Sequence, residues 1–179
     1  YNAHFTTMKR RIFEDLVAWK NQPDRKPLVL RGARQVGKTY ILDEFGRTRF
    51  PAFHRFDFEK NGRDLIPLFE ESLSPEALLQ NLMLYQEKPI SQEDLVIFDE
   101  IQNCPRALTS LKYFCEELPE QAVCAAGSLL GVALSDESYP VGKVSYLDLF
   151  PMSFEEFLIS RGPDMLVEAF QSSWAAGNV

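Results

Sequence analysis

One short segment, residues 32–39, constrains the fold of this chain more than any other feature. It reads GARQVGKT and fits the pattern G-x-x-x-x-G-K-[ST]. An apolar run over 27–31 precedes it and predicts a buried strand, and a helical pattern over 39–45 follows it. In a strand, loop and helix in this order, the backbone N–H groups of the loop and the helix N-terminus favour phosphate. The segment therefore predicts a phosphate-binding loop.

Positions within this loop have separate expected roles in binding a nucleotide. Glycine permits the backbone conformations and the close approach that phosphate binding requires. Lys38 is expected to reach the β- and γ-phosphates of ATP and to act in catalysis, and Thr39 is expected to ligate Mg²⁺. Arg34 is a candidate for contact with phosphate or with a neighbouring subunit. The expected nucleotide-binding residues are Gly32, Ala33, Arg34, Gln35, Val36, Gly37, Lys38, Thr39 and Tyr40.

Strand and helix patterns alternate along the rest of the chain. Further strands are predicted at 52–58, 95–98, 122–126 and 144–150. Helices are predicted at 8–19, 63–71 and 108–118, after Ser74 as N-cap before Pro75, and after a capping box of Ser153 and Glu156. Such alternation favours an α/β fold of three layers around a mostly parallel sheet, with ligands at the carboxyl ends of its strands.

The length of 179 residues suits one main domain. We expect an N-terminal helix and lead-in over 1–26, a core over 27–160, and the start of a following helical region over 161–179. The chain begins YNAH, without an initiator Met and without the basic and apolar regions of a signal peptide. We therefore expect a cut or partly observed N-terminus.

Composition excludes several classes of function. The net charge of −7 argues against a general electrostatic grip on nucleic acid or on an anionic membrane surface. The longest apolar stretch, 123–134, is interrupted by polar residues and glycines and is shorter than the ~20 residues of a membrane span. The three cysteines are too far apart for a Cys-x-x-Cys clip, and an odd number of thiols in apolar surroundings favours the cytoplasm. These cysteines are Cys104, Cys115 and Cys124.

Two acidic residues end the apolar run 95–98. Asp99 is expected to hold the Mg²⁺ shell from a strand near the phosphate loop. Adjacent Glu100 is expected to polarise the attacking water as a general base. The alternative for Glu100 is a structural ion pair with a nearby arginine such as Arg106.

Two further residues are candidate contacts of the γ-phosphate. Ser128 follows the strand predicted at 122–126, where its hydroxyl group is a candidate ligand for the γ-phosphate or for the water. The alternative for Ser128 is the N-cap of a helix over 129–134. Lys143 is a candidate cationic sensor of the γ-phosphate, with a solvated lysine as the alternative.

With these residues placed, the chain resembles a large group of bacterial and archaeal AAA-like ATPases, related to the archaeal ATPases and to signalling NTPases. The resemblance rests on RGARQVGKT at 31–39, FDEIQ at 98–102, GSLL at 127–130 and LFPMSFEEF at 149–157. It implies a five-stranded sheet in which the strand ending at Ser128 lies between the loop strand and the Asp99 strand. It also implies a catalytic glutamate at Glu100 and a longer intact protein with a nuclease-like C-terminal domain.

The leading hypothesis is a Mg²⁺-dependent ATPase that changes the position of attached domains or partners. We expect slow hydrolysis, because an arginine that completes the transition state would have to come from a second subunit, from beyond Val179, or from Arg34. The rival hypothesis is a nucleotide-binding switch or assembly module without hydrolysis, and a weaker one is a small-molecule kinase. ATP or ADP is the expected ligand, and a homo-oligomer or a C-terminal domain in cis the expected partner.

Overall fold

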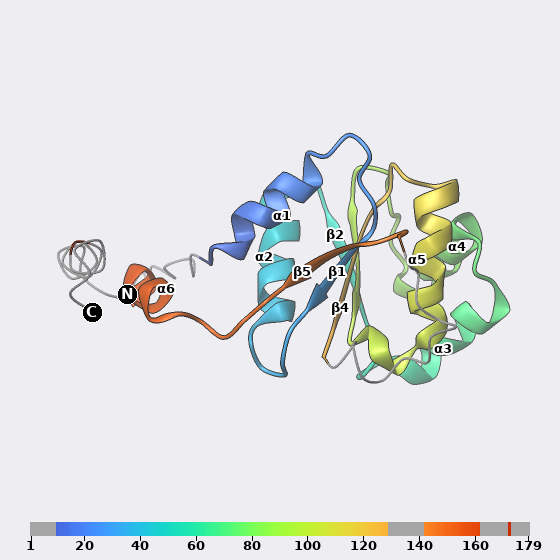
Figure 1. The fold of residues 1–179 in the computed structure, drawn as a ribbon. Coiled ribbons are helices and arrows are strands. Elements are labelled where there is room, and N and C mark those ends of the chain that lie inside the picture. The colour runs from blue at the N-terminus through green and yellow to red at the C-terminus, as the bar shows by residue number, and fades with distance from the viewer. Residues whose placement is uncertain (1–9, 129–141, 162–171, 173–179) are drawn as a thin grey trace, which may run out of the picture.

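The computed structural model describes residues 10–128, 142–161 and 172. Helices and strands alternate along the described chain, as predicted (Figure 1). The elements are α1 (Ile12–Lys20), β1 (Leu28–Arg31), α2 (Lys38–Arg49), β2 (Phe53–Asp57), α3 (Gly62–Glu71), α4 (Pro75–Gln86), β3 (Leu95–Asp99), the 3₁₀ helix η1 (Ile101–Asn103), α5 (Pro105–Glu117), β4 (Ala122–Gly127), β5 (Ser145–Asp148) and α6 (Phe154–Arg161).

The five strands form one sheet in the order β2-β3-β4-β1-β5, and every neighbouring pair is parallel. Strand β4 therefore lies between β1 and β3, as the resemblance implies. Because all strands run the same way, their carboxyl ends meet at one edge of the sheet. In the register of this sheet Asp57 lies beside Asp99, and Arg31 lies between Gly127 and Asp148. The edge thus gathers the loop after β1 and the acidic end of β3.

Helices cover both faces of the sheet, which makes three layers (Figure 1). Helices α1 and α2 pack on one face, where Leu16 and Phe45 belong to one hydrophobic cluster. Helices α3, α4 and α5 pack on the other face, where Leu78 and Phe114 belong to a second cluster. Strands β3 and β4 are buried along their whole length. Burial on both faces explains why these strands read as continuous apolar runs.

Phe98 fixes the end of β3 that carries the acidic residues. Its ring lies 5.4 to 6.3 Å, centroid to centroid, from four other phenylalanine rings, and such contacts add to the stabilisation from burial. Asp99 follows it directly, so the packing of this ring anchors the backbone of the candidate site. The four neighbours are Phe56, Phe58, Phe69 and Phe114.

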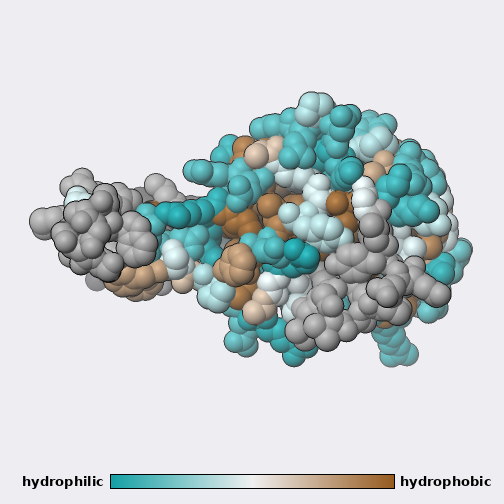
Figure 2. Space-filling model, in the orientation of Figure 1, coloured by the Kyte–Doolittle hydropathy of each residue, from teal (hydrophilic) through white to brown (hydrophobic). Residues whose placement is uncertain are grey.

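Strand β5 forms one edge of the sheet and is only partly buried. Figure 2 shows hydrophobic residues at the surface in the middle of this face, where Figure 1 draws β5. After β5 the predicted capping box is present. The Ser153 N–H group donates to Glu156 Oε2 at 3.0 Å, and the Glu156 N–H group donates to Ser153 Oγ at 3.1 Å. This box opens α6 as the sequence predicts.

Helix α2 continues to Arg49, one turn beyond the predicted end at residue 45. The apolar periodicity stops there because residues 47–49 are exposed. Gly46 lies in this last turn, where β2 approaches closely. A Cβ atom added at Gly46 would lie 2.6 Å from Phe53 Cγ and 2.7 Å from Phe53 Cβ. The helix therefore needs a residue without a side chain at this position.

Replacing Gly46 by alanine is expected to lower the free energy of unfolding by about 1 kcal/mol, the midpoint of the net effect of two opposing contributions. Alanine is better than glycine inside a helix by about 1 kcal/mol, but forcing a methyl group into a packed site costs about 1 to 3 kcal/mol. Gly62→Ala is the control, because its added Cβ would meet Ile66 Cδ1 at 3.4 Å, an ordinary contact. Urea unfolding measures both variants. A Gly46→Ala variant as stable as the wild type would contradict the close approach.

In the part of the chain that the structure describes, no helix combines the length and the apolar character needed to cross a membrane. Cys104, Cys115 and Cys124 are all free thiols.

Candidate functional site

The loop over 32–39 joins β1 to α2 at the carboxyl edge of the sheet. Two of its residues have a positive φ, Gln35 at 64° and Gly37 at 96°. A side chain at Gly37 would strain this left-handed backbone. A Cβ atom added at Gly32 would lie 2.4 Å from the Leu149 carbonyl oxygen. The two glycines of the motif thus serve different purposes: Gly37 permits the turn of the loop, and Gly32 permits its packing against the segment after β5.

Lys38 is the first residue of α2, and only 5% of it is exposed. Its amine donates to the Gly32 carbonyl at 3.0 Å and to the Ala33 carbonyl at 2.8 Å. Burial lowers the pKa of Lys38, whereas the carboxylates of Glu100 and Asp99 raise it. An ammonium group has three donors. Two hold the loop in shape, so the third and the positive charge remain for a ligand.

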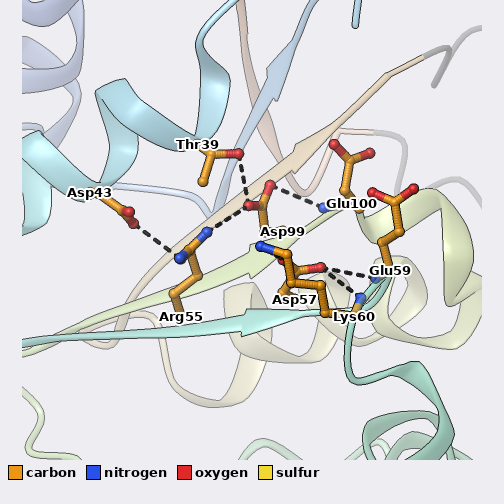
Figure 3. Close-up of polar contacts among 8 residues, drawn as sticks. All are labelled: Thr39, Asp43, Arg55, Asp57, Glu59, Lys60, Asp99 and Glu100. Atoms are coloured by element: carbon orange, nitrogen blue, oxygen red, sulfur yellow. Dashed lines mark hydrogen bonds and ion pairs between the residues drawn. The ribbon is translucent and has the colours of Figure 1, made fainter. Parts of the chain in front are cut away.

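Asp99 ends β3 and is 2% exposed, yet three groups donate to its carboxylate (Figure 3). Its Oδ2 atom accepts a hydrogen bond from Thr39 Oγ1 at 2.8 Å and another from Arg55 Nη1 at 3.3 Å. Its Oδ1 atom accepts one from the Glu100 N–H group at 3.1 Å. A carboxylate has about four acceptor positions. The structure therefore brings Thr39 and Asp99 together and leaves acceptor capacity on Oδ1.

Arg55 is a residue of this site that the sequence analysis does not predict. It lies on β2 between two carboxylates, with Nη1 3.3 Å from Asp99 Oδ2 and Nε 3.3 Å from Asp43 Oδ1 (Figure 3). Asp43 lies one helical turn after Thr39 on α2. Burial raises the pKa of Asp43, and the Arg55 charge opposes this effect. The only signals in the sequence are an arginine within a strand and an acid four residues after Thr39.

A second acid, Asp57, lies beside Asp99 in the register of β2 and β3. The N–H groups of Glu59 and Lys60 each donate to its Oδ1 atom at 3.0 Å, and Lys60 Nζ lies 3.3 Å from its Oδ2 atom (Figure 3). Asp57 therefore caps the turn that follows β2. The acidic residues at the two strand ends therefore have different partners: Asp99 contacts Thr39, whereas Asp57 contacts its own turn.

Glu100 adopts the left-handed backbone conformation, with φ at 52°. Gln102 Nε2 donates to Glu100 Oε2 at 2.5 Å. Arg106, the alternative partner, instead donates to the carbonyl oxygens of Phe69 at 2.7 Å and Glu70 at 3.4 Å. The alternative of an ion pair between Glu100 and Arg106 is therefore wrong, because the guanidinium group of Arg106 joins α5 to the end of α3.

Ser128 follows β4 at the same edge of the sheet and is 1% exposed. Its Oγ atom is buried and has no hydrogen-bond partner among the described residues. A buried hydroxyl group of this kind calls for an explanation, and a bound phosphate or water would satisfy it. The helix over 129–134, which Ser128 would cap in the alternative interpretation, lies outside the described residues.

Lys143 is placed differently from the prediction. It lies two residues before β5, so it belongs to the amino edge of the parallel sheet, opposite the phosphate loop. Its amine lies 2.9 Å from Glu116 Oε1 on α5. The hypothesis of Lys143 as a sensor of the γ-phosphate is therefore wrong.

A pocket of about 430 Å³ adjoins the phosphate loop. It is lined by Arg10, by residues 34–37 of the loop, by Tyr40 and Ile41 of α2, and by Pro151 and Met152. The pocket therefore offers both backbone groups of the loop and apolar side chains. Residues 151 and 152 come from the segment that follows β5, which Gly32 also contacts through Leu149.

Arg10 joins this region to α6 and is buried. Its Nη1 atom donates to the Val36 carbonyl at 3.2 Å, and its Nη2 atom donates to the Phe150 carbonyl at 2.7 Å. Its Nε atom lies 3.2 Å from Glu156 Oε1. One side chain thus connects the start of the described chain, the phosphate loop and the capping box of α6. The sequence gives no local signal for this connection.

The sequence model of the AAA domain family matches residues 24–158, which include the phosphate loop, Asp99, Glu100 and Ser128. The chain belongs to this family. Membership of this family implies that the chain is an AAA-like P-loop ATPase domain that binds a nucleotide. No curated protein matches the chain significantly.

A solved structure supports the fold of this AAA domain. The Walker-type ATPase PABY2304 of Pyrococcus abyssi aligns with a TM-score of 0.54 and 20% sequence identity, over 92% of this chain and 63% of that one. PCH-2 of C. elegans aligns with a TM-score of 0.47 and 14% identity, over 93% of this chain and 47% of that one. The chain thus spans less than two thirds of the length of either structure.

Proposed function

We propose that this AAA domain binds ATP or ADP with Mg²⁺ through residues 32–40 and hydrolyses ATP slowly. The observation that carries the proposal is the contact of Thr39 Oγ1 with Asp99 Oδ2 at 2.8 Å, beside the buried amine of Lys38. A hydroxyl and a carboxylate at one point, next to a cation and a loop of N–H groups, suit a metal ion bound to phosphate oxygens.

Thr39 and Asp99 are the residues that would hold Mg²⁺. Both offer oxygen atoms, the ligands that this hard cation prefers, and Asp99 Oδ1 retains acceptor capacity for the ion or for a water of its shell. When bound, Mg²⁺ neutralises charge that develops on the phosphate oxygens. Arg55 compensates the cost of burying the Asp99 carboxylate, and it contacts the same oxygen atom, Oδ2, as Thr39.

The remaining roles follow from position at the same edge. Lys38 would donate to the β- and γ-phosphates with its third hydrogen, and Ser128 Oγ would donate to the γ-phosphate or to the attacking water. Glu100 would accept the proton of that water as its oxygen bonds to the γ-phosphorus. The bond between the γ-phosphorus and the bridging oxygen breaks in the same process, and ADP leaves.

The pocket beside the loop suits the base of the nucleotide. Tyr40, Ile41, Pro151 and Met152 give it apolar walls, which match the faces of a planar purine ring. Residues 34–37, which also line it, belong to the loop that would hold the phosphates. Burial of the base here would place the triphosphate along the loop toward Asp99.

We expect slow hydrolysis because Arg55 and Arg10, two arginines near the site, already have partners. Arg55 is paired with Asp99 and Asp43, and Arg10 is held by Val36 and Glu156. Arg34 is exposed on the loop. An arginine at the transition state of other P-loop enzymes contributes roughly 10³ to 10⁵ in rate. A second subunit or a C-terminal domain in cis would have to supply it, or Arg34 would act across an interface.

The contacts of Arg10 favour an output through α6. They connect Val36 of the phosphate loop with Glu156 at the start of α6, so a shift of the loop changes the support of that helix. ATP would then control the position of the regions attached to α6. The same contact would serve a nucleotide-binding switch without hydrolysis, which is the second candidate function.

Replacing Asp99 by asparagine is expected to weaken the Mg²⁺ dependence of nucleotide binding. Removal of one carboxylate from a metal site raises the Mg²⁺ concentration needed for half-maximal binding by roughly 10- to 100-fold. Titration of ATP binding against Mg²⁺ by calorimetry measures the change. Asp24→Asn is the control, since it removes the same charge from an exposed turn before β1. An unchanged Mg²⁺ requirement in Asp99→Asn would refute the metal site.

A further inference from the structure

We propose that Gln102 is a positioning residue that fixes the direction of the Glu100 carboxylate. The inference rests on the proposed function, because it concerns the residue that would activate water. Gln102 lies on η1, two residues after Glu100, and its Nε2 atom donates to Glu100 Oε2 at 2.5 Å. No other hydrogen bond to the Glu100 carboxylate occurs between described residues.

The chemistry of the two groups decides how the amide is oriented. An ionised carboxylate only accepts hydrogen bonds, so the amide nitrogen of Gln102 must face Glu100 and the amide oxygen must face away. A hydrogen bond to a charged acceptor is stronger than one between neutral groups. The pair therefore restricts the rotation of the Glu100 side chain while leaving its second oxygen, Oε1, to act on water.

The backbone around Glu100 is fixed as well. Its left-handed conformation is unfavourable for a residue with a side chain and persists only where the surroundings determine it. The Glu100 N–H group donates to Asp99 Oδ1 at 3.1 Å, and the Asn103 N–H group donates to the Glu100 carbonyl at 3.0 Å. Ile101, which follows Glu100 in the chain, is fully buried in the core. The backbone is thus held by the strand end, and Gln102 completes the arrangement at the side chain.

The other end of the Gln102 amide is not used within the described structure. Its Oε1 atom is buried and has no hydrogen-bond partner among the described residues. An amide that only stabilised η1 would be expected to have both ends paired. Within the described residues, the one hydrogen bond of this amide is therefore the one that it donates to Glu100. The geometry favours a role in orienting Glu100 over a role in stabilising η1.

The test compares Gln102→Met with the wild type, both alone and in a Glu100→Gln background. Methionine keeps the length of the side chain and removes both polar ends. We expect kcat to fall roughly 10- to 100-fold, the scale on which a displaced catalytic group loses rate. KM, and ATP affinity measured by calorimetry, should change less than about twofold. Gln22→Met, at an exposed turn, is the matched control.

The double variant separates positioning from structural support. If Gln102 acts through Glu100, Gln102→Met should cost little further rate once Glu100 is glutamine. An equal loss in both backgrounds, a kcat like that of the wild type, or a loss of ATP affinity would each overturn the inference. A wild type whose hydrolysis does not depend on Glu100 would overturn the proposed function as well, so the two failures are distinguishable.

Discussion

Replacing Lys38 by alanine will weaken ATP binding by roughly 10- to 150-fold, the factor that corresponds to hydrogen bonds with charged groups worth about 1.5 to 3 kcal/mol. The amine is buried under the loop, where it donates to the carbonyl groups of Gly32 and Ala33. Alanine removes the charge that would face the phosphates. It also removes the two contacts that hold the loop in its binding shape.

Calorimetry with ATP and Mg²⁺ measures this loss, and the melting temperature of each variant shows whether the domain is still folded. Lys112→Ala is the matched control, because it removes an exposed lysine from α5. Its affinity for ATP should equal that of the wild type. Equal affinity in Lys38→Ala would remove the basis for assigning nucleotide binding to this loop.

The parts of the fold that the sequence predicts are those determined by local pattern. The continuous apolar runs of β3 and β4 match strands buried on both faces, and the capping box of Ser153 and Glu156 opens α6. The phosphate loop is predicted for the same reason, since a strand, a loop and a helix follow one another in the chain. The place of β4 between β1 and β3 came from the family resemblance, because periodicity carries no information on strand order.

The parts that sequence reasoning missed depend on contacts between distant segments. Arg55 meets Asp99 only because β2 and β3 pair in a register that puts Asp57 beside Asp99. Arg10 meets Phe150 across 140 residues of chain. Neither contact leaves a periodic signal. The same register places Asp57 beside Asp99, although only Asp99 accepts a hydrogen bond from Thr39.

The structure contradicts one candidate role and one alternative because of the direction of an element. Lys143 precedes β5, and the start of a parallel strand lies at the edge opposite the ligand. This could have been inferred from the predicted strand itself. Arg106 is near Glu100 in the chain, but α5 directs its guanidinium group to the carbonyl groups at the end of α3. Closeness in sequence therefore did not predict the partner of Glu100.

Replacing Glu100 by glutamine will leave ATP binding largely intact and slow hydrolysis at least tenfold. A positioned general base contributes roughly 10²- to 10⁴-fold to a rate, and glutamine cannot accept the proton of the attacking water. Glutamine has the shape of glutamate, and its amide oxygen can still accept the hydrogen bond from Gln102. The left-handed turn and the contact with Asp99 involve the backbone of residue 100, so the metal site should be unaffected.

Single-turnover hydrolysis separates this effect from changes in binding or product release, and calorimetry reports ATP affinity independently. Glu117→Gln is the control, because it makes the same change at an exposed position on α5. A Glu100→Gln variant that binds ATP but hydrolyses slowly supports the general base. A variant that hydrolyses as fast as the wild type would make Glu100 structural. Measurable hydrolysis would then need another base, and a wild type without hydrolysis would make the domain a nucleotide-binding switch that moves α6 through Arg10.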